Sequence, residues 1–423
     1  MSITLGLERI ATLLKVLGNP HLRLQVIHVA GTNGKGSVCA YIDNILRRAG
    51  YRVGRFNSPH LLEARDSIRI NGEALDRVAY QNLHDEIADA CRRASLDASP
   101  FERLAAAAFA CFERRQVEVA VVEVGMGGRL DATNVFPMPL LSVITSIAMD
   151  HSAFLGGTIS AIAREKAGIM RHNGIVVIAP QREENARMVL EECAREFECQ
   201  KYMVQPAVSI GRDGWAETTV LGGKKLSYPL TLHGKFQLEN TATAVVALDC
   251  LRRTHASVFG RITDEHIVDG LRTTRWPGRL DWVCSDKFGK VLVDGAHNPA
   301  AAMALREFVD QELVRMGKKG GVKWIVGATQ GKDVNELLQL LVREGDSLCA
   351  VGFSQPEGMP WIQCVSPEDI TRSAPAGSRV NSAASLEEAL ATEAKEDDSM
   401  LVLCGSLYLV SDFYRLVGLD NQL

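Results

Sequence analysis

Short apolar runs alternate with amphipathic segments over the first half of the chain. Each run has the length of a buried strand, and the segments between them repeat apolar residues at the spacing of a helix that packs on one side. Such an alternation predicts a mostly parallel sheet with helices on both faces. The expected strands are Leu24–Ala30, Arg52–Phe56, Val117–Val124, Leu141–Ile147 and Gly174–Ala179, and the expected helices include Val38–Arg48, Tyr80–Ala94 and Phe101–Arg114.

A second alternation begins near Lys290 and predicts a smaller α/β domain of Rossmann-like type. Pro277 and Gly278 interrupt the helical pattern before it, so we expect one domain over residues 1–277 and another over residues 278–423. The expected strands of the second domain are Val291–Val293, Trp324–Gly327, Ser347–Gly352 and Met400–Cys404, with helices over Ala300–Met316, Val334–Arg343 and Ser385–Ala394. Elsewhere, Met1–Pro20 is typical of an amphipathic helix, and Gly222-Gly223 suggests a hairpin in the less regular segment Val204–Leu232.

Length and composition agree with a two-domain enzyme. The 423 residues exceed the usual size of one hydrophobic core. A formal charge of −4 argues against non-specific binding to nucleic acid or to an anionic membrane, and we expect small-molecule substrates instead. We also expect a monomer. The ten cysteines form no Cys-x-x-Cys pair, which favours reduced thiols over a zinc site. Because no secretory signal and no membrane-spanning apolar stretch are present, we expect a cytoplasmic protein.

The first expected strand leads into a phosphate-binding loop, Gly31–Ser37. Glycines let backbone N–H groups approach phosphate oxygens, and the following helix start adds the positive end of its dipole. Lys35 supplies a full cation, and Ser37 offers a hydroxyl to Mg²⁺. The loop departs from the Walker A pattern at Val29, which stands where the first glycine belongs, and at Gly36, which separates the lysine from the serine. A purely structural glycine turn is the alternative.

Three more expected strands end in polar residues that are candidates for binding a metal. Ser58 follows the second strand, Glu123 ends an otherwise apolar strand, and His151 follows the strand Leu141–Ile147. The carboxyl ends of parallel strands share one edge of the sheet, where ligands gather. A buried carboxylate needs a cation, and Mg²⁺ meets that need. The alternatives are a turn serine, an ion pair between Glu123 and Arg129, and a surface histidine.

Two other strings carry candidate chemistry. Arg164-Glu165-Lys166 has the composition of a solvated charge run, which favours an exposed Lys166. In the second domain, Asp294 and His297 follow the strand Val291–Val293, and we expect them to reach back across an interdomain cleft toward the nucleotide.

Taken together, these strings resemble the folylpolyglutamate synthase and dihydrofolate synthase branch of the Mur ligase family. The matching strings are HVAGTNGKGS, NSPHL, EVGMGGRLDATN, DHSAFLG, REKAGI, WPGR, DGAHNP and CGSLYL, spread from residue 28 to residue 409. The resemblance implies an ATP-dependent amide ligase in which ATP phosphorylates a carboxylate and the amine of glutamate displaces phosphate. Such a reaction needs anions to be positioned and developing charge to be neutralised.

The resemblance also implies residue roles. Lys35, Lys166, Asp294 and His297 would take part in catalysis, with Lys166 carbamylated by CO₂ and so converted to an anion. ATP would be held by Gly31, Thr32, Asn33, Gly34, Lys35, Gly36 and Ser37 and by Asn240, Arg279, Asp294 and His297. Ser58 and Glu123 would ligate one Mg²⁺ and His151 a second, and a monovalent cation is a further candidate cofactor. Phe101, Asp131 and Ala132 would contact a pterin ring. One departure is Phe236, where the family has a histidine before Gln237.

The family contains two activities that differ in the acceptor. The segments Leu5–Ile10 and Pro356–Ile362 resemble the monofunctional fungal members, so we expect ligation of glutamate to dihydropteroate. Addition of glutamate to tetrahydrofolates is the alternative. A nucleotide-binding protein without catalysis is a third, against which Lys35, Glu123, His151 and Lys166 argue.

Overall fold

The computed structural model describes residues 6–211, 214–318, 320–394 and 398–419. The chain divides into two compact units, which are described separately below. The first comprises Met1–Thr231 and Phe236–Arg275, and the second comprises Leu232–Lys235 and Trp276–Leu423. The second unit therefore begins beside the Pro277-Gly278 break and takes in a short segment, 232–235, that the pattern did not single out.

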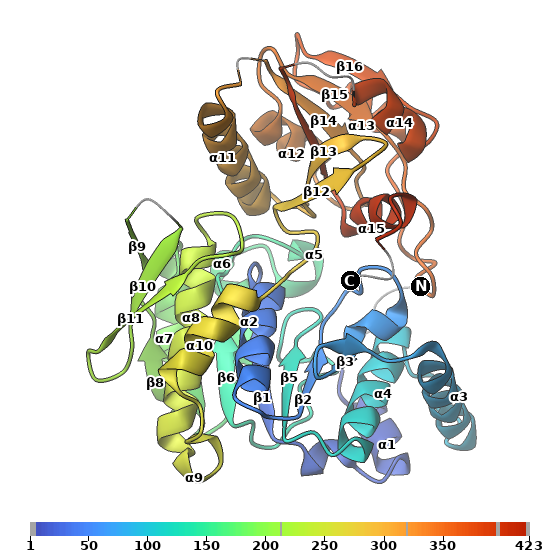
Figure 1. The fold of residues 1–423 in the computed structure, drawn as a ribbon. Helices are drawn as coiled ribbons and strands as arrows, with labels where there is room; N and C mark the ends of the chain where they lie inside the picture. Colours follow the sequence, from blue (N-terminus) through green and yellow to red (C-terminus); the bar gives the residue numbers. More distant parts are fainter. Residues whose placement is uncertain (1–5, 212–213, 319, 395–397, 420–423) are drawn as a thin grey trace. The chain divides into compact units, whose positions relative to one another are not determined.

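The first unit is built on an eight-stranded sheet of order β4-β3-β2-β5-β1-β6-β7-β8 (Figure 1). The six strands from β2 to β8 in this order are parallel, and β3 and β4 add an antiparallel edge, so the predicted mostly parallel sheet is confirmed. The strands are β1 (Val26–Ala30), β2 (Val53–Phe56), β3 (Ile68–Ile70), β4 (Glu73–Ala74), β5 (Val119–Glu123), β6 (Leu141–Ile144), β7 (Ile175–Ile178) and β8 (Gln200–Met203).

Helices cover both faces of this sheet. They are α1 (Glu8–Val16), α2 (Lys35–Arg48), α3 (Arg77–Arg93), α4 (Pro100–Arg114), α5 (Ser152–Leu155), α6 (Ile159–Ala167), α7 (Glu184–Glu196), α8 (Gln237–Thr254), α9 (Ala256–Phe259) and α10 (Asp264–Thr273), with 3₁₀ turns at Pro20–Arg23 and Ala64–Ser67. Helix α4 begins at a capping box formed by Ser99 and Glu102, and its alanine-rich face packs with α1 and α3 in one core cluster. Helices α6 and α7 pack against β6 and β7 in another.

The segment after β8 is more regular than its sequence suggested. It holds a three-stranded antiparallel sheet of β9 (Val208–Ile210), β10 (Trp215–Thr219) and β11 (Lys225–Pro229). The expected hairpin joins β10 to β11, and Gly222 and Gly223 have φ angles of +87° and +83°, which glycine adopts without strain.

The second unit is a six-stranded sheet of order β12-β13-β17-β14-β15-β16, parallel except for β12 at one edge. Its strands are β12 (Asp281–Ser285), β13 (Gly289–Val293), β14 (Val322–Val326), β15 (Ser347–Ala350), β16 (Arg379–Ser382) and β17 (Met400–Cys404). Its helices are α11 (Pro299–Met316), α12 (Val334–Leu341), α13 (Pro367–Arg372), α14 (Leu386–Glu393) and α15 (Leu407–Leu416). The hydrophobic pattern did not indicate β12, β16, α13 or α15.

Two general expectations can be compared with the structure. All ten cysteines lie in the described part of the chain and have free thiols. Within that part, no helix is both long enough and apolar enough to cross a membrane.

Helix α2, which follows the glycine-rich loop, is fixed by a buried ion pair. Arg55 on β2 donates from Nη1 to Asp43 Oδ2 at 2.9 Å, and both side chains are almost fully buried. Asn44 donates from Nδ2 to the carbonyl of Gly270 on α10 at 2.7 Å. The helix is therefore held against both the sheet and its neighbouring helix.

We expect Asp43→Ala to lower the free energy of unfolding by about 3–5 kcal/mol, because it leaves the Arg55 charge buried without its partner. Asp269 is the matched control, since it pairs with Arg48 at the partly exposed surface. Asp269→Ala should cost less than about 1 kcal/mol. Denaturant unfolding of both variants measures the difference, and equal losses would contradict a special role for the buried pair.

Candidate nucleotide site at the carboxyl ends of the first sheet

The register of the first sheet brings four loops to one edge. Val29 pairs with Glu123, Ala30 with Ile144 on β6, and Phe56 with Val122 on β5. Strands β1, β2, β5 and β6 therefore end at nearly the same level, and the loops that follow them carry the predicted site residues. This is the edge where parallel sheets bind ligands.

The loop after β1 depends on glycine at two positions. Gly31 has a φ of +147°, and a Cβ there would lie 1.8 Å from Oγ1 of Thr145. Gly34 has a φ of +89°, and a Cβ there would lie 2.3 Å from Oδ1 of Asn240. The backbone thus passes close to β6 on one side and to α8 on the other, which explains both glycines sterically.

The amides of the loop divide into two groups. Those of Thr32 and Asn33 donate to the carbonyl of Ser146 at 2.9 and 3.2 Å, which ties the loop to β6. Helix α2 then begins at Lys35, and no side chain in the described residues caps it. The N–H groups of its first turn are therefore available to an anion, as in other phosphate-binding helix starts. The departures from Walker A leave this arrangement intact.

A charged cluster lies beside the loop. The Glu123 carboxylate is 5% exposed and accepts a hydrogen bond at Oε2 from Nδ2 of Asn57 at 2.7 Å. Its Oε1 lies 3.9 Å from Nζ of Lys35, which also donates to the carbonyl of Thr32 at 3.1 Å. Arg129 instead pairs with Glu165 at 2.8 Å, so the alternative ion pair between Glu123 and Arg129 is not formed.

Ser58 and His151 differ in their surroundings. The Ser58 hydroxyl oxygen is buried and has no hydrogen-bond partner in the described part of the chain. A buried oxygen in this state, next to the Asn57–Glu123 pair, fits a hard cation such as Mg²⁺. His151 immediately precedes α5 and has a side chain that is 42% exposed, and its Nε2 lies 3.9 Å from Oδ2 of Asp150. Among the described residues no three His, Cys, Asp or Glu side chains group as a metal cluster.

Lys166 is buried, so the prediction of an exposed lysine from its charge run was wrong. On α6, Arg164 and Glu165 form ion pairs at the surface, while Lys166 is 4% exposed. Its Nζ donates to the carbonyl of Gly31 at 2.7 Å, which places it at the glycine-rich loop. Gly128 permits the approach, because a Cβ there would lie 3.0 Å from Cα of Lys166.

Burial lowers the pKa of Lys166 to about 7. The positive charge of Lys35 adds to this lowering, while the carboxylates of Asp150 and Asp131 oppose it. A large fraction of this amine is therefore neutral near pH 7, and a neutral amine is a nucleophile.

The residues predicted to contact the acceptor lie beside the same strand end. Phe101 packs against Gly125, where a Cβ would lie 2.4 Å from the ring, and Ala132 is 6% exposed. Asp131 is 3% exposed, and its carboxylate accepts bonds from the amides of Met126 and Thr133, each at 2.9 Å. Burial raises the pKa of Asp131, against the effect of these bonds. Asp131 therefore shapes the glycine-rich turn, and its contact with a pterin ring stays a prediction.

A buried histidine extends this network. The Thr133 hydroxyl donates to Asp131 Oδ1 at 2.6 Å, so it accepts from Nε2 of His28 at 2.8 Å. Burial lowers the pKa of His28 to about 3, which keeps the ring neutral. No sequence pattern had indicated a role for His28 or for Asn57, although Asn57 immediately precedes Ser58.

The second unit holds its predicted residues in one turn after β13. Asp294 accepts hydrogen bonds from the amides of Leu280 at 2.8 Å and Ala296 at 2.7 Å, and burial raises its pKa. The ring of His297 hydrogen-bonds through Nδ1 to the carbonyl of Gly295 at 2.8 Å. A Cβ on Gly295 would lie 2.3 Å from Nη1 of Arg279, so the guanidinium packs on this turn.

Comparison with known proteins gives two family matches. The Mur ligase middle domain matches residues 95–248, and the family described as "Dihydrofolate synthetase, C-terminal domain" matches residues 281–416.

Among the relatives, a probable dihydrofolate synthetase of Schizosaccharomyces pombe is 41% identical and covers 99% of this chain and 100% of its own length. The dihydrofolate synthetase of Saccharomyces cerevisiae is 35% identical over 98% of each chain. The dihydrofolate synthase/folylpolyglutamate synthase of Escherichia coli is 32% identical over 98% of this chain and 92% of its own.

Two solved structures are similar over the whole chain. Folylpolyglutamate synthase of Mycobacterium tuberculosis complexed with ADP has a TM-score of 0.85 and 31% identity, covering 98% of this chain and 95% of that one. E. coli FolC in complex with DHPP and ADP has a TM-score of 0.80 and 28% identity, covering 100% and 95%.

Replacing Gly34 with Ala should weaken ADP binding by about tenfold, because the new methyl group displaces Asn240 and the start of α2. Gly50→Ala is the matched control, since Gly50 has a φ of +81° and no described atom within 4 Å of the position that a Cβ would take. Both variants should lose about 1–2 kcal/mol of stability from the positive φ. Titration calorimetry with ADP separates them, and unchanged affinity in Gly34→Ala would exclude this loop from the nucleotide site.

Proposed function

We infer the reaction of this chain from its family, because it belongs to the dihydrofolate synthetase and folylpolyglutamate synthase branch of the Mur ligases. It is an ATP-dependent ligase that attaches glutamate in folate synthesis. One observation supports assigning the reaction to this site: Lys35, Glu123 and the buried Lys166 lie together around the loop after β1.

We propose dihydropteroate as the acceptor. The fungal relatives at 41% and 35% identity are dihydrofolate synthetases, and residues 281–416 match a family described by that activity. Folylpolyglutamate synthase activity is the second candidate, because the E. coli relative at 32% identity carries both names.

The proposed chemistry assigns separate tasks to the cluster. Amides at the start of α2 and the Lys35 ammonium would bind the phosphates of ATP and neutralise the charge that develops when the γ-phosphoryl group moves to the acceptor carboxylate. Ser58 and Glu123 would hold Mg²⁺, with His151 as a ligand to a second ion. When bound, Mg²⁺ supplies positive charge at the phosphate oxygens. Asn240 in the first unit, and Arg279, Asp294 and His297 in the second, are the further proposed nucleotide contacts.

We further propose that Lys166 carries a carbamate. The ammonium first loses one proton, and the neutral amine then attacks CO₂, forming an N–C bond as one C=O π bond opens. A second proton leaves the nitrogen, so a cation is replaced by an anion. The buried position and the pKa of about 7 support this step, since an ordinary lysine would stay protonated. Contact between the carbamate and Mg²⁺ would account for placing an anion so close to phosphates.

Other properties follow the expectations from sequence. Ten free thiols suit a reducing cytoplasm, and we propose that location together with a monomeric state.

We expect Lys166→Arg to lower the ligation rate by about a hundredfold or more, because a guanidinium stays protonated and cannot add CO₂. Arg164→Lys on the same helix is the control, since its exposed ion pairs with Glu192 and Glu196 contribute little. Wild-type enzyme depleted of CO₂ should lose activity and regain it with bicarbonate, more completely above pH 7, where more of the amine is neutral. Phosphate release measures each rate, and an active Lys166→Arg variant would contradict the carbamate.

Dihydropteroate should support rapid ATP-dependent incorporation of glutamate, and tetrahydrofolate little or none. A folate acceptor places its reactive carboxylate one glutamyl unit further from the pterin, and an error of about 1 Å in position can cost on the order of a hundredfold in rate. Asp131→Ala should damage the reaction strongly by releasing the turn that follows Glu123. Incorporation of labelled glutamate, measured with each acceptor in turn, distinguishes the two activities. Equal or faster turnover of tetrahydrofolate would favour folylpolyglutamate synthase activity instead.

A further inference from the structure

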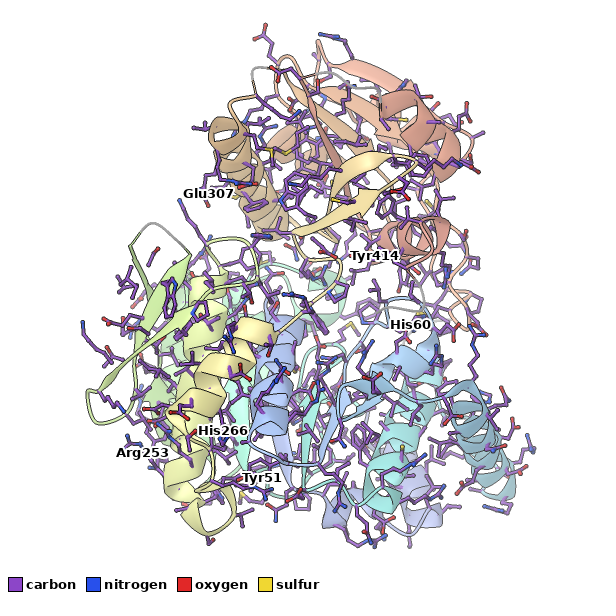
Figure 2. All side chains as sticks on the ribbon, viewed as in Figure 1. Tyr51, His60, Arg253, His266, Glu307 and Tyr414 are labelled. Atoms are coloured by element: carbon purple, nitrogen blue, oxygen red, sulfur yellow. The ribbon has the colours of Figure 1, made fainter. Side chains whose placement is uncertain are left out.

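In the second unit, a buried tyrosine hydroxyl hydrogen-bonds to residues on both sides of Arg279 in the sequence. Tyr414, on α15 and labelled in Figure 2, has no exposed surface. Its hydroxyl accepts a hydrogen bond from the amide of Gly278 at 2.7 Å and donates one to Oδ2 of Asp281 at 2.5 Å. One hydroxyl therefore joins the residue before Arg279 to the residue two positions after it.

The turn after β13 also forms hydrogen bonds with the segment that carries Arg279. The amide of Gly295 donates to the carbonyl of Gly278 at 3.0 Å, and the amide of Leu280 donates to Oδ2 of Asp294 at 2.8 Å. Gly278, Leu280 and Asp281 are thus all anchored within the second unit. Arg279 itself is only partly buried, and its backbone is fixed on both sides.

We propose that Tyr414 is a positioning residue that holds Arg279 in the orientation required to bind a nucleotide phosphate. This inference rests on the proposed role of Arg279 in ATP binding. A guanidinium donates its hydrogen bonds in a fixed planar geometry, so a small rotation of its backbone misaligns it with a phosphate. The Tyr414 ring packs in the core, but its hydroxyl adds two bonds directed only at the segment that carries Arg279.

The electrostatics are consistent with this role. Burial and the neighbouring Asp281 carboxylate raise the pKa of Tyr414, so the hydroxyl stays protonated and can donate to Asp281 while it accepts from Gly278. Among the described residues, no other group bonds to this hydroxyl.

The test is a double-mutant cycle read as ADP affinity by titration calorimetry. Tyr414→Phe keeps the ring and removes only the hydroxyl, and we expect ADP binding to weaken about fivefold. Arg279→Ala should weaken it by at least as much. In the double variant the Tyr414→Phe change should add almost nothing, because no guanidinium remains to be positioned.

Two further variants act as controls. Tyr51→Phe, just before β2 in the first unit (Figure 2), also removes a buried hydroxyl, which donates to the carbonyl of Val258 at 2.9 Å. It should leave ADP affinity unchanged while lowering the melting temperature comparably. Asp281→Asn weakens one bond of the Tyr414 hydroxyl without altering the core, and should reduce ADP affinity in the same direction if Tyr414→Phe does not fold.

Additive losses in the cycle, or unchanged ADP affinity in Tyr414→Phe and Asp281→Asn, would overturn the positioning role. Unchanged affinity in Arg279→Ala would overturn it as well, because its premise would be wrong. Since ADP binding is measured without acceptor or glutamate, these outcomes are independent of whether the proposed acceptor is correct.

Discussion

The candidate site depends on one carboxylate at the end of an apolar strand. Glu123 is almost fully buried, and a buried charge is costly unless hydrogen bonds and opposite charge compensate it. Nδ2 of Asn57 donates a hydrogen bond to one carboxylate oxygen at 2.7 Å, and Nζ of Lys35 lies 3.9 Å from the other. Asn57 is thereby fixed with Ser58 beside it, and the ammonium of Lys35, at the start of α2, is drawn toward the end of β5. Compensation of this single charge brings the loops after β1, β2 and β5 together.

A second ionisable side chain, that of Lys166, reaches the same loop because the backbone of α6 comes close to the turn after β5. Gly128 lets α6 come near the turn after β5, and Lys166 reaches the Gly31 carbonyl at 2.7 Å. Burial lowers the pKa of Lys166 to about 7, and the positive charge of Lys35 beside the same glycine-rich loop adds to this lowering. Packing therefore does more than hold Lys166 in place, because it also lowers the pKa of the amine.

Sequence patterns predicted the fold well where period and residue type agreed. Buried strands such as Val26–Ala30 read as continuous apolar runs, and the glycine-rich loop marked the start of α2. The edge strand β16 is exposed along its whole length and the edge strand β12 is mostly half-buried, and neither carries such a run, so nothing in the pattern indicated them. The inward position of Lys166 depends on which face of α6 meets the turn after β5. Likewise, the contact of Tyr414 with Gly278 joins residues that are far apart in sequence, which no local pattern reports.

The proposed phosphate-binding cluster itself cannot distinguish the two acceptors, because both react through a carboxylate with the same γ-phosphate. Discrimination must come from how rigidly the remainder of the acceptor is held relative to Glu123. Gly125 follows that strand almost directly, and the Phe101 ring packs where its Cβ would be. Asp131 closes the turn by accepting from the amides of Met126 and Thr133. The surface proposed for the pterin is thus joined to the proposed metal ligand through a few backbone bonds. Because this link is short, the position of the pterin would closely determine the position of the reacting carboxylate.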